Sequence, residues 1–381
     1  MKKILLMILA FLLAGCAAAP APTEPITQPP TIPATEPPTE PPTEPPTEPP
    51  DPIAEAVEDM TPEEKVGQLF LARYNESSAP AHTEEYHLGG WILFSPDFDG
   101  ETPDSIRTEL EALQALSNVP LLIAVDEEGG TVTRVSRNPA FRSSKFSSPR
   151  SLYNHGGMEL VLSTEAEKSE LLSSLGINVN MAPVCDITTD KNAFMYSRSL
   201  GLGAEDTGAV IAGMVQTMED HGVAAVLKHF PGYGNNADTH VGIARDSRTL
   251  AQLEENDLVP FRMGFEAGCG AVLVSHTIVE CLDAELPASL SPAVIGYIRK
   301  EMDFDGVIVT DDLVMQAITD RYGAGEAAVM AVQAGCDLLC STEYVKQYNA
   351  VLTAVEEGRI TEDTLDAAVY RILRWKLSFS Q

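Results

Sequence analysis

One segment of the 381-residue chain contains side chains that can donate and accept protons, together with glycines that make the backbone flexible. It runs from Lys228 to His240 and begins Lys-His-Phe-Pro-Gly. Asp238 and His240 are two residues apart, so on an extended backbone their side chains point the same way. A carboxylate bonded to one imidazole nitrogen fixes the ring tautomer and raises its basicity. The pair is therefore a candidate proton donor and acceptor near neutral pH.

A second candidate group follows an apolar run. Residues 306–310 read Gly-Val-Ile-Val-Thr and deliver Asp311, which Asp312 follows. A carboxylate in that place can attack an anomeric carbon and form a glycosyl ester. Asp312 is the rival, but it would point the other way if the strand persists, and it suits the N-cap of the next helix better. We therefore favour Asp311.

A third segment, residues 124–134, contains Asp-Glu-Glu-Gly-Gly from position 126. Two glycines after an apolar run let the backbone approach a ligand closely. Asp126 could accept hydrogen bonds from sugar hydroxyls, and Arg134 could donate to them.

Short apolar runs alternate with amphipathic helical patterns along the chain. The expected strands cover residues 68–73, 90–95, 121–126, 178–182, 225–229, 271–276, 307–311 and 337–341. The expected helices cover residues 103–116, 159–175, 206–221, 253–267, 292–301, 326–334 and 361–377. This alternation predicts an α/β fold with a parallel sheet. Eight strands favour a closed (β/α)8 (TIM) barrel over an open doubly wound sheet.

Polar residues stand at the ends of the expected strands. They are Arg73, Asp126, Lys228, His229, His276 and Asp311. In a (β/α)8 barrel the carboxyl ends of all strands open onto one face, which carries the chemistry. We therefore expect these side chains to meet at one barrel mouth.

Taken together, the motifs resemble glycoside hydrolase family 3, and within it the single-domain bacterial β-N-acetylglucosaminidases. The resemblance covers nearly all of residues 55–376. Its motifs are Asp-Glu-Glu-Gly-Gly from 126, Asn-Met-Ala-Pro-Val from 180, the Lys-His-Phe-Pro-Gly loop, Pro-Ala-Ser-Leu-Ser-Pro from 287, and Thr-Asp-Asp-Leu from 310.

The resemblance implies a (β/α)8 barrel and a retaining exo-β-N-acetylglucosaminidase. Asp311 matches the nucleophile, and His240, oriented by Asp238, matches the acid/base dyad of this branch. The resemblance further implies that terminal N-acetylglucosamine is released from cell-wall fragments or related glycans. It implies no cofactor and no metal.

The resemblance also implies a set of sugar-binding residues. Asp126 matches the carboxylate that binds outer hydroxyls of the terminal sugar. His276 follows the sixth strand, where a histidine is often found, and a purely structural role is the alternative for it. The other polar contacts fall on Arg134, Arg198, Lys228 and His229.

The chain departs from the family pattern in its catalytic loop, which is one residue shorter and has Tyr233 in place of the usual histidine. Thr131 replaces a common arginine. Both changes bear on leaving-group preference. An N-acetylglucosaminide phosphorylase, or a β-glucosidase or β-xylosidase of the same family, remains an alternative. Two further alternatives are a metallohydrolase that uses His229, Asp238, His240 and His276, and a wall-binding lipoprotein on an inactive barrel.

The first residues predict export and anchoring. Met1-Lys2-Lys3 precedes an apolar run that ends in Leu-Ala-Gly before Cys16. This predicts a lipoprotein signal over residues 1–15, with lipid on Cys16 and the enzyme on the outer side of the cell membrane. An ordinary signal peptide is the alternative. Residues 16–52 are rich in Thr, Glu and Pro and predict a disordered linker. Residues 53–381 remain for the catalytic domain.

Composition narrows the partners. The formal net charge is −31, which argues against nucleic acid and permits a neutral sugar. Besides Cys16 there are five scattered cysteines, Cys185, Cys269, Cys281, Cys336 and Cys340. Their odd number and irregular spacing suit neither a disulfide framework nor a zinc site. Most are expected to be buried core residues. The sequence leaves the oligomeric state open.

Overall fold

A parallel sheet forms the centre of the protein in the computed structural model, which describes residues 51–234 and 244–379. Within these residues the sheet has nine strands in the order β5-β4-β3-β2-β1-β11-β10-β8-β6. In chain order they are β1 (Phe70–Arg73), β2 (Gly90–Leu93), β3 (Leu122–Val125), β4 (Val179–Asn180), β5 (Ala224–Ala225), β6 (Leu227–Phe230), β8 (Ala271–Val274), β10 (Val307–Thr310) and β11 (Leu338–Ser341).

The two ends of this strand order come together. β5 pairs with β4, β6 pairs with β8, and one residue, Val226, separates β5 from β6. The chain after β4 also reaches this stretch, since Val226 N donates to Ala182 O at 2.9 Å and Cys185 N to Lys228 O at 2.6 Å. The sheet is therefore nearly closed and barrel-like, with β5 and β6 in the place of the fifth predicted strand.

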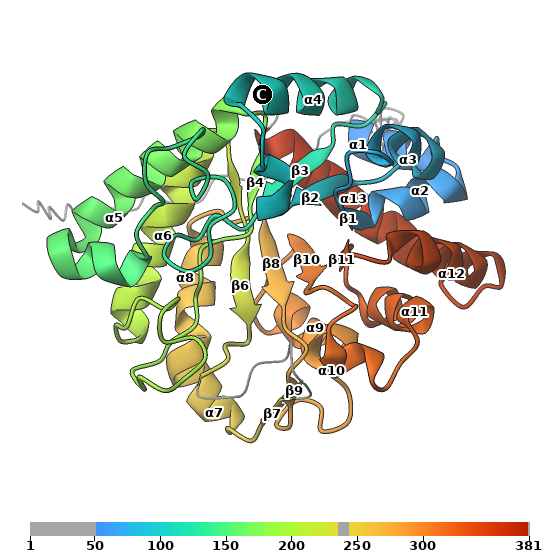
Figure 1. Ribbon diagram of the computed structural model, residues 1–381. Helices are drawn as coiled ribbons and strands as arrows, with labels where there is room; N and C mark the ends of the chain where they lie inside the picture. The colour runs from blue at the N-terminus through green and yellow to red at the C-terminus, as the bar shows by residue number, and fades with distance from the viewer. Residues whose placement is uncertain (1–50, 235–243, 380–381) are drawn as a thin grey trace, which may run out of the picture. The chain divides into compact units, whose positions relative to one another are not determined.

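Helices surround the sheet on its outer side (Figure 1). They are α1 (Pro52–Glu58), α2 (Pro62–Gln68), α3 (Ala79–Tyr86), α4 (Pro103–Ala115), α5 (Pro149–Ser174), α6 (Ala204–Asp220), α7 (Leu250–Gln252), α8 (Val259–Glu266), α9 (Pro292–Lys300), α10 (Gln316–Thr319), α11 (Ala324–Ala334), α12 (Tyr344–Glu356) and α13 (Glu362–Phe379). A small separate pair, β7 (Arg245–Asp246) with β9 (Ile278–Val279), completes the strands. The predicted alternation of strands and helices is confirmed.

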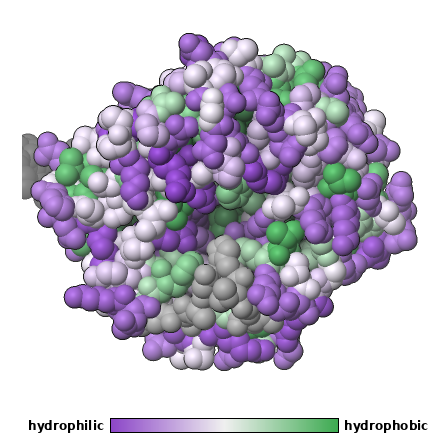
Figure 2. All heavy atoms as spheres, in the orientation of Figure 1, coloured by the Kyte–Doolittle hydropathy of each residue, from purple (hydrophilic) through white to green (hydrophobic). Residues whose placement is uncertain are grey.

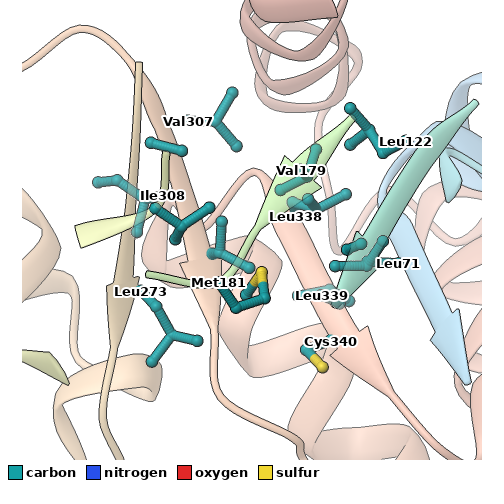
Figure 3. Close-up of a cluster of buried hydrophobic side chains, with 14 of the residues drawn as sticks. Leu71, Leu122, Val179, Met181, Leu273, Val307, Ile308, Leu338, Leu339 and Cys340 are labelled. Carbon is teal, nitrogen blue, oxygen red and sulfur yellow. The ribbon is translucent and has the colours of Figure 1, made fainter. Parts of the chain in front are cut away.

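The sequence explains these elements locally. In α4, Thr102 caps the amino end, Pro103 occupies the first turn, and Ile106, Leu110 and Leu113 form the buried face. The sheet strands are short runs that are buried almost throughout, as expected when helices cover one face and the barrel interior the other. Figure 3 shows side chains of several strands meeting in the interior, which is filled by apolar groups such as Leu71, Leu122, Ile308 and Leu339.

Three predicted boundaries were wrong. Gln68 was assigned to the first strand but ends α2, because the Thr61–Glu64 capping box starts a helix just before the strand. Helix α5 begins at Pro149, and its first part is set off by non-helical backbone at Gly156 and Gly157. The single helix expected over residues 253–267 is instead a π-helical turn, η3 (Leu253–Asp257), followed by α8. Helices α1, α2, α3, α7, α10 and α12 were not predicted.

Four of the five cysteines after Cys16 are buried, as predicted, and Cys281 is exposed. In the part of the chain that the structure describes, no helix is long and apolar enough to cross a membrane.

A buried carboxylate fastens the amino end of β11 to two outer helices. Asp337 is 1% exposed and accepts a hydrogen bond from the main-chain N–H of Ile308 at 2.7 Å. It also pairs with Arg299 of α9 and with Arg371 of α13. One side chain thus links β10, β11, α9 and α13.

We expect Asp337→Ala to lower the free energy of unfolding by about 3–5 kcal/mol, because it leaves two partly buried guanidinium groups without their shared partner. Urea unfolding measures the change. The matched control is Asp305→Ala, which removes an exposed partner of the same Arg371 and should cost less than about 1 kcal/mol. Equal losses in the two variants would contradict the role given to Asp337.

Candidate active site

A cavity of about 640 Å³ opens at the carboxyl ends of the sheet strands. Its polar wall includes Arg73, Asp126, Arg134, Arg198, Lys228, His229, Asp311 and Asp312. Met181, Leu273 and Cys340, which are also labelled in Figure 3, belong to its apolar wall. In Figure 2 the surface is hollowed near the centre of the view, where hydrophobic and hydrophilic side chains meet. Most polar residues predicted at the strand ends therefore share one cavity.

A chain of alternating charges lies along one side of this cavity. Lys228 Nζ, in β6, lies 2.6 Å from Asp126 Oδ1 and 2.7 Å from Glu128 Oε1. Arg198 binds Glu128 with two nitrogens, Nε at 2.9 Å and Nη2 at 2.6 Å. Glu128 thus pairs with both Arg198 and Lys228, and Lys228 also pairs with Asp126.

These contacts fix the charge states. Burial alone would raise the pKa of Glu128, but Lys228 and Arg198 hold that pKa well below its usual range. Burial would lower the pKa of Lys228, but Asp126 and Glu128 raise it. The Arg198 pKa is likewise raised by Glu128 against the effect of burial. Glu128, Lys228 and Arg198 therefore stay ionised around neutral pH.

The tautomer of His229 follows from its two partners. Its Nε2 lies 3.1 Å from Arg198 Nη2, and a guanidinium can only donate, so Nε2 must accept. Nδ1 therefore carries the proton and donates to Asp186 Oδ2 at 2.7 Å. Burial would raise the pKa of Asp186, but its charge interaction and hydrogen bond with His229, the hydrogen bond from the Tyr233 N–H and the nearby Arg198 charge lower it. The contacts with Arg198 and Asp186 fix the orientation of the His229 ring.

A second buried glutamate shapes the loop that carries Arg134. Glu127 is fully buried and accepts from the N–H groups of Arg134 at 2.6 Å and Val135 at 2.8 Å. The main-chain N–H and carbonyl of Glu127 are hydrogen-bonded to the side chain of Asn180, the last residue of β4. Arg134 then lies 3.7 Å from Asp126. Its Nε is buried without a hydrogen-bond partner among the described residues, and the residue as a whole lines the cavity.

Asp311 follows β10 and faces the cavity. Its Oδ1 accepts from the Asp312 N–H at 2.9 Å. Asp312 also lines the cavity, but its carboxylate accepts hydrogen bonds from the N–H groups of Val314 and Thr342 and from the Thr342 hydroxyl. The Asp312 carboxylate is thus engaged in hydrogen bonds within the protein, which hold the main chain beside Asp311 in place.

The structure places His276 behind the cavity. It is fully buried and does not belong to the cavity wall. Its Nε2 lies 3.0 Å from the Asp312 carbonyl and its Nδ1 lies 2.7 Å from Ser289 Oγ. Since the carbonyl can only accept, Nε2 carries the proton. His276 contacts the main chain beside Asp311 and is not positioned as a direct sugar ligand.

Asp238 and His240 lie outside the described residues, as does the lipidation candidate Cys16. Among the residues that are described, no group of three or more His, Cys, Asp or Glu side chains could hold a metal ion.

Comparison with known proteins identifies the family. Residues 61–375 match the glycosyl hydrolase family 3 N terminal domain. The chain belongs to glycosyl hydrolase family 3. It is 32% identical over 330 residues to the beta-hexosaminidase LpqI of Mycobacterium tuberculosis, with 83% of each chain covered.

Two solved structures are also similar to this family 3 chain. One is a family 3 beta-N-acetylglucosaminidase from Paenibacillus sp. str. FPU-7, with 37% identity and a TM-score of 0.80. The match covers 84% of this chain but only 63% of that protein, which is longer. The other is M. tuberculosis LpqI, with 30% identity, a TM-score of 0.76, and 84% and 95% of the two chains covered.

Sequence reasoning did not assign a role to two groups that organise this family 3 site, Glu128 and Asp186. Both follow strand ends, which is a detectable signal. Their side chains, however, are 3% and 1% exposed and point at other protein groups. Only the folded structure shows that they hold the cavity cations and the His229 ring.

We expect Glu128→Gln to lower the free energy of unfolding at pH 7 by about 3–5 kcal/mol, because the buried Lys228 and the largely buried Arg198 lose their shared anion. A carboxyl whose pKa is lowered by folding adds stability above its unfolded pKa, which is near 4.5, and loses it as the pH falls. The gap between wild type and variant should therefore narrow below about pH 4.5.

Urea unfolding at pH 7 and at about pH 4 checks this. As a control, Glu167→Gln removes a largely exposed partner of Arg142 and should show little loss at either pH. A gap for Glu128→Gln that stays constant or widens at low pH would refute the charge assignment.

Proposed function

We propose that the protein is a retaining exo-β-N-acetylglucosaminidase with a (β/α)8 catalytic barrel. The observation that carries the proposal is the position of Asp311. It opens into the same cavity as Asp126, Lys228, Arg134 and Arg198, which offer hydrogen-bond acceptors and donors for sugar hydroxyls. A carboxylate nucleophile facing such a wall suits attack at an anomeric carbon.

In the proposed mechanism, Asp311 attacks the anomeric carbon as the bond to the leaving oxygen breaks. His240, oriented by Asp238, gives its proton to that oxygen. A water molecule, deprotonated by His240, then cleaves the ester between the sugar and Asp311, so the anomeric configuration is retained. The roles given to Asp238 and His240 rest on the family motif in the sequence.

The described residues of the cavity wall are poor candidates for the general acid, which favours an acid outside this set. Neighbouring charges and hydrogen bonds lower the pKa of Glu128 and of Asp186, and neighbouring carboxylates raise those of Lys228 and Arg198, so these groups are poorly placed to cycle a proton near neutral pH. Burial raises the pKa of Asp312, but its carboxylate already accepts hydrogen bonds from Val314 and Thr342. His240 remains the better candidate.

The choice of sugar rests on the relatives. The similar M. tuberculosis protein is named a beta-hexosaminidase, and the Paenibacillus structure is a beta-N-acetylglucosaminidase. We propose the same glycosyl group for this chain. A β-glucosidase or β-xylosidase is the alternative within the family, and phosphate in place of water would make the enzyme a phosphorylase.

We further propose that the enzyme is exported, anchored by lipid at Cys16, and acts on cell-wall fragments. The sequence of residues 1–15 and the Pro-rich tract over 16–52 support this location. An anchored enzyme outside the cell membrane would meet peptidoglycan pieces that end in N-acetylglucosamine.

Residues 51–381 should release the chromophore from an aryl β-N-acetylglucosaminide in preference to the matching β-glucoside. Asp311→Ala should abolish turnover, and His240→Ala should reduce it by about 100-fold or more on a poor leaving group. Initial rates on both substrates measure this. Preference for the glucoside would overturn the choice of sugar, and activity that survives Asp311→Ala would overturn the nucleophile.

Cys16→Ser in the full-length chain should move the enzyme from the membrane fraction to the soluble fraction of the producing cells, because the acyl chains would have no attachment site. Fractionation with an activity assay measures the distribution. Cys281→Ser, which changes an exposed cysteine of the folded part, is the control and should leave the enzyme in the membrane. A Cys16→Ser variant that still carries covalently bound fatty acid would rule out lipid anchoring at this site.

A further inference from the structure

The segment that contains Asp238 and His240 has two described ends. Its first end is the stretch from His229 to Gly234, which continues from β6. Its second end is Ala244 and strand β7, which pairs with β9. Contacts between these two ends therefore set how far apart the ends of the segment lie.

Arg248 connects both ends. Its Nη2 donates to the carbonyl of Gly232, on the first end, at 2.7 Å. Its Nε lies 2.9 Å from Oδ1 of Asp246, on the second end. Its Nη1 lies 2.7 Å from Asp257 Oδ2 in η3. Asp246 and Asp257 are 1% and 2% exposed, so the guanidinium is held by two buried carboxylates.

Two glycines in the first end leave space for the Arg248 side chain and its partner Asp257. Gly234 has φ of +54°, and a Cβ there would lie 2.6 Å from Arg248 Nη1. Gly232 has φ of +106°, and a Cβ there would lie 2.9 Å from Asp257 Oδ1. Glycine permits both the left-handed backbone and the close approach of the cluster. On the other side, Asp186 accepts from the N–H groups of His229 and Tyr233.

We propose that Arg248 is a positioning residue for the acid/base step: by joining Gly232 to Asp246, it sets the separation of the two chain ends between which Asp238 and His240 lie. The inference rests on the proposed function of His240. Arg248 itself need not touch the substrate. A shift of a proton donor by about 1 Å can cost about 100-fold in rate.

The test compares two substrates that differ in their need for an acid. N,N′-diacetylchitobiose has a sugar leaving group that must be protonated, whereas 2,4-dinitrophenyl β-N-acetylglucosaminide has a leaving group that departs without a proton. For each, kcat/KM reports the steps up to the glycosyl-enzyme. The ratio of the two values does not depend on the fraction of folded enzyme, so a loss of stability cannot mimic the effect.

For Arg248→Met we expect kcat/KM on chitobiose to fall about 10- to 100-fold more than on the dinitrophenyl substrate. Arg248→Lys, which keeps the charge but not the planar fork, should give a smaller shift of the same sign. The matched control is Arg245→Met. Arg245 is a neighbouring, largely exposed residue of β7 that pairs with Glu280, and its loss should leave the ratio unchanged.

The His240→Ala variant distinguishes a failure of the role proposed for Arg248 from a failure of the assignment of His240 as the acid. If His240→Ala shifts the ratio strongly and Arg248→Met lowers both substrates equally, the role of Arg248 is overturned while the acid assignment stands. If His240→Ala leaves the ratio unchanged, the acid assignment fails and this inference fails with it. A shift in both variants, with Arg245→Met unchanged, supports the proposal.

Discussion

The buried Lys228 and the largely buried Arg198 share the carboxylate of Glu128, and the geometry of the cavity wall depends on this pairing. Removing charged groups from water costs several kcal/mol each, so such a cluster persists only when every member finds well-placed partners. Glu128 satisfies Arg198 with both oxygens, and Asp126 completes the shell of Lys228. The result is a rigid set of donors and acceptors that needs little reorganisation when a sugar binds.

The strands make this cluster possible because its members come from different parts of the chain. Asp126 and Glu128 follow β3, Arg198 lies in the long connection after β4, and Lys228 belongs to β6. The same region is where the sheet nearly closes, through the contact of Cys185 N with Lys228 O. A change in strand register there would move Lys228 away from Glu128, so the ion pairs and the closure reinforce each other.

Much of this could be read from the sequence, and the limits have physical causes. Buried strands are apolar runs that end in polar residues, so Asp126, Lys228 and Asp311 could be assigned to one mouth. The sequence does not report side-chain direction after a strand ends. It therefore left open whether His276, which lies behind the wall, binds the sugar as was predicted for His229 or has a structural role. Gln68 was misplaced because a capping box competes with the apolar run beside it.

The pairing pattern also bears on which ligands the cavity can accept. The chain is strongly acidic overall, yet four cationic side chains line the cavity. Arg73 is paired with Asp97, Arg134 lies near Asp126, and Lys228 and Arg198 are paired with Glu128. Since each cation faces an anion of the protein, the wall offers directed hydrogen bonds without a large net positive field. Such a wall suits the hydroxyls of a neutral glycosyl group better than it suits a polyanion, which agrees with the proposal that the Asp311 carboxylate, on the same cavity wall, attacks the anomeric carbon.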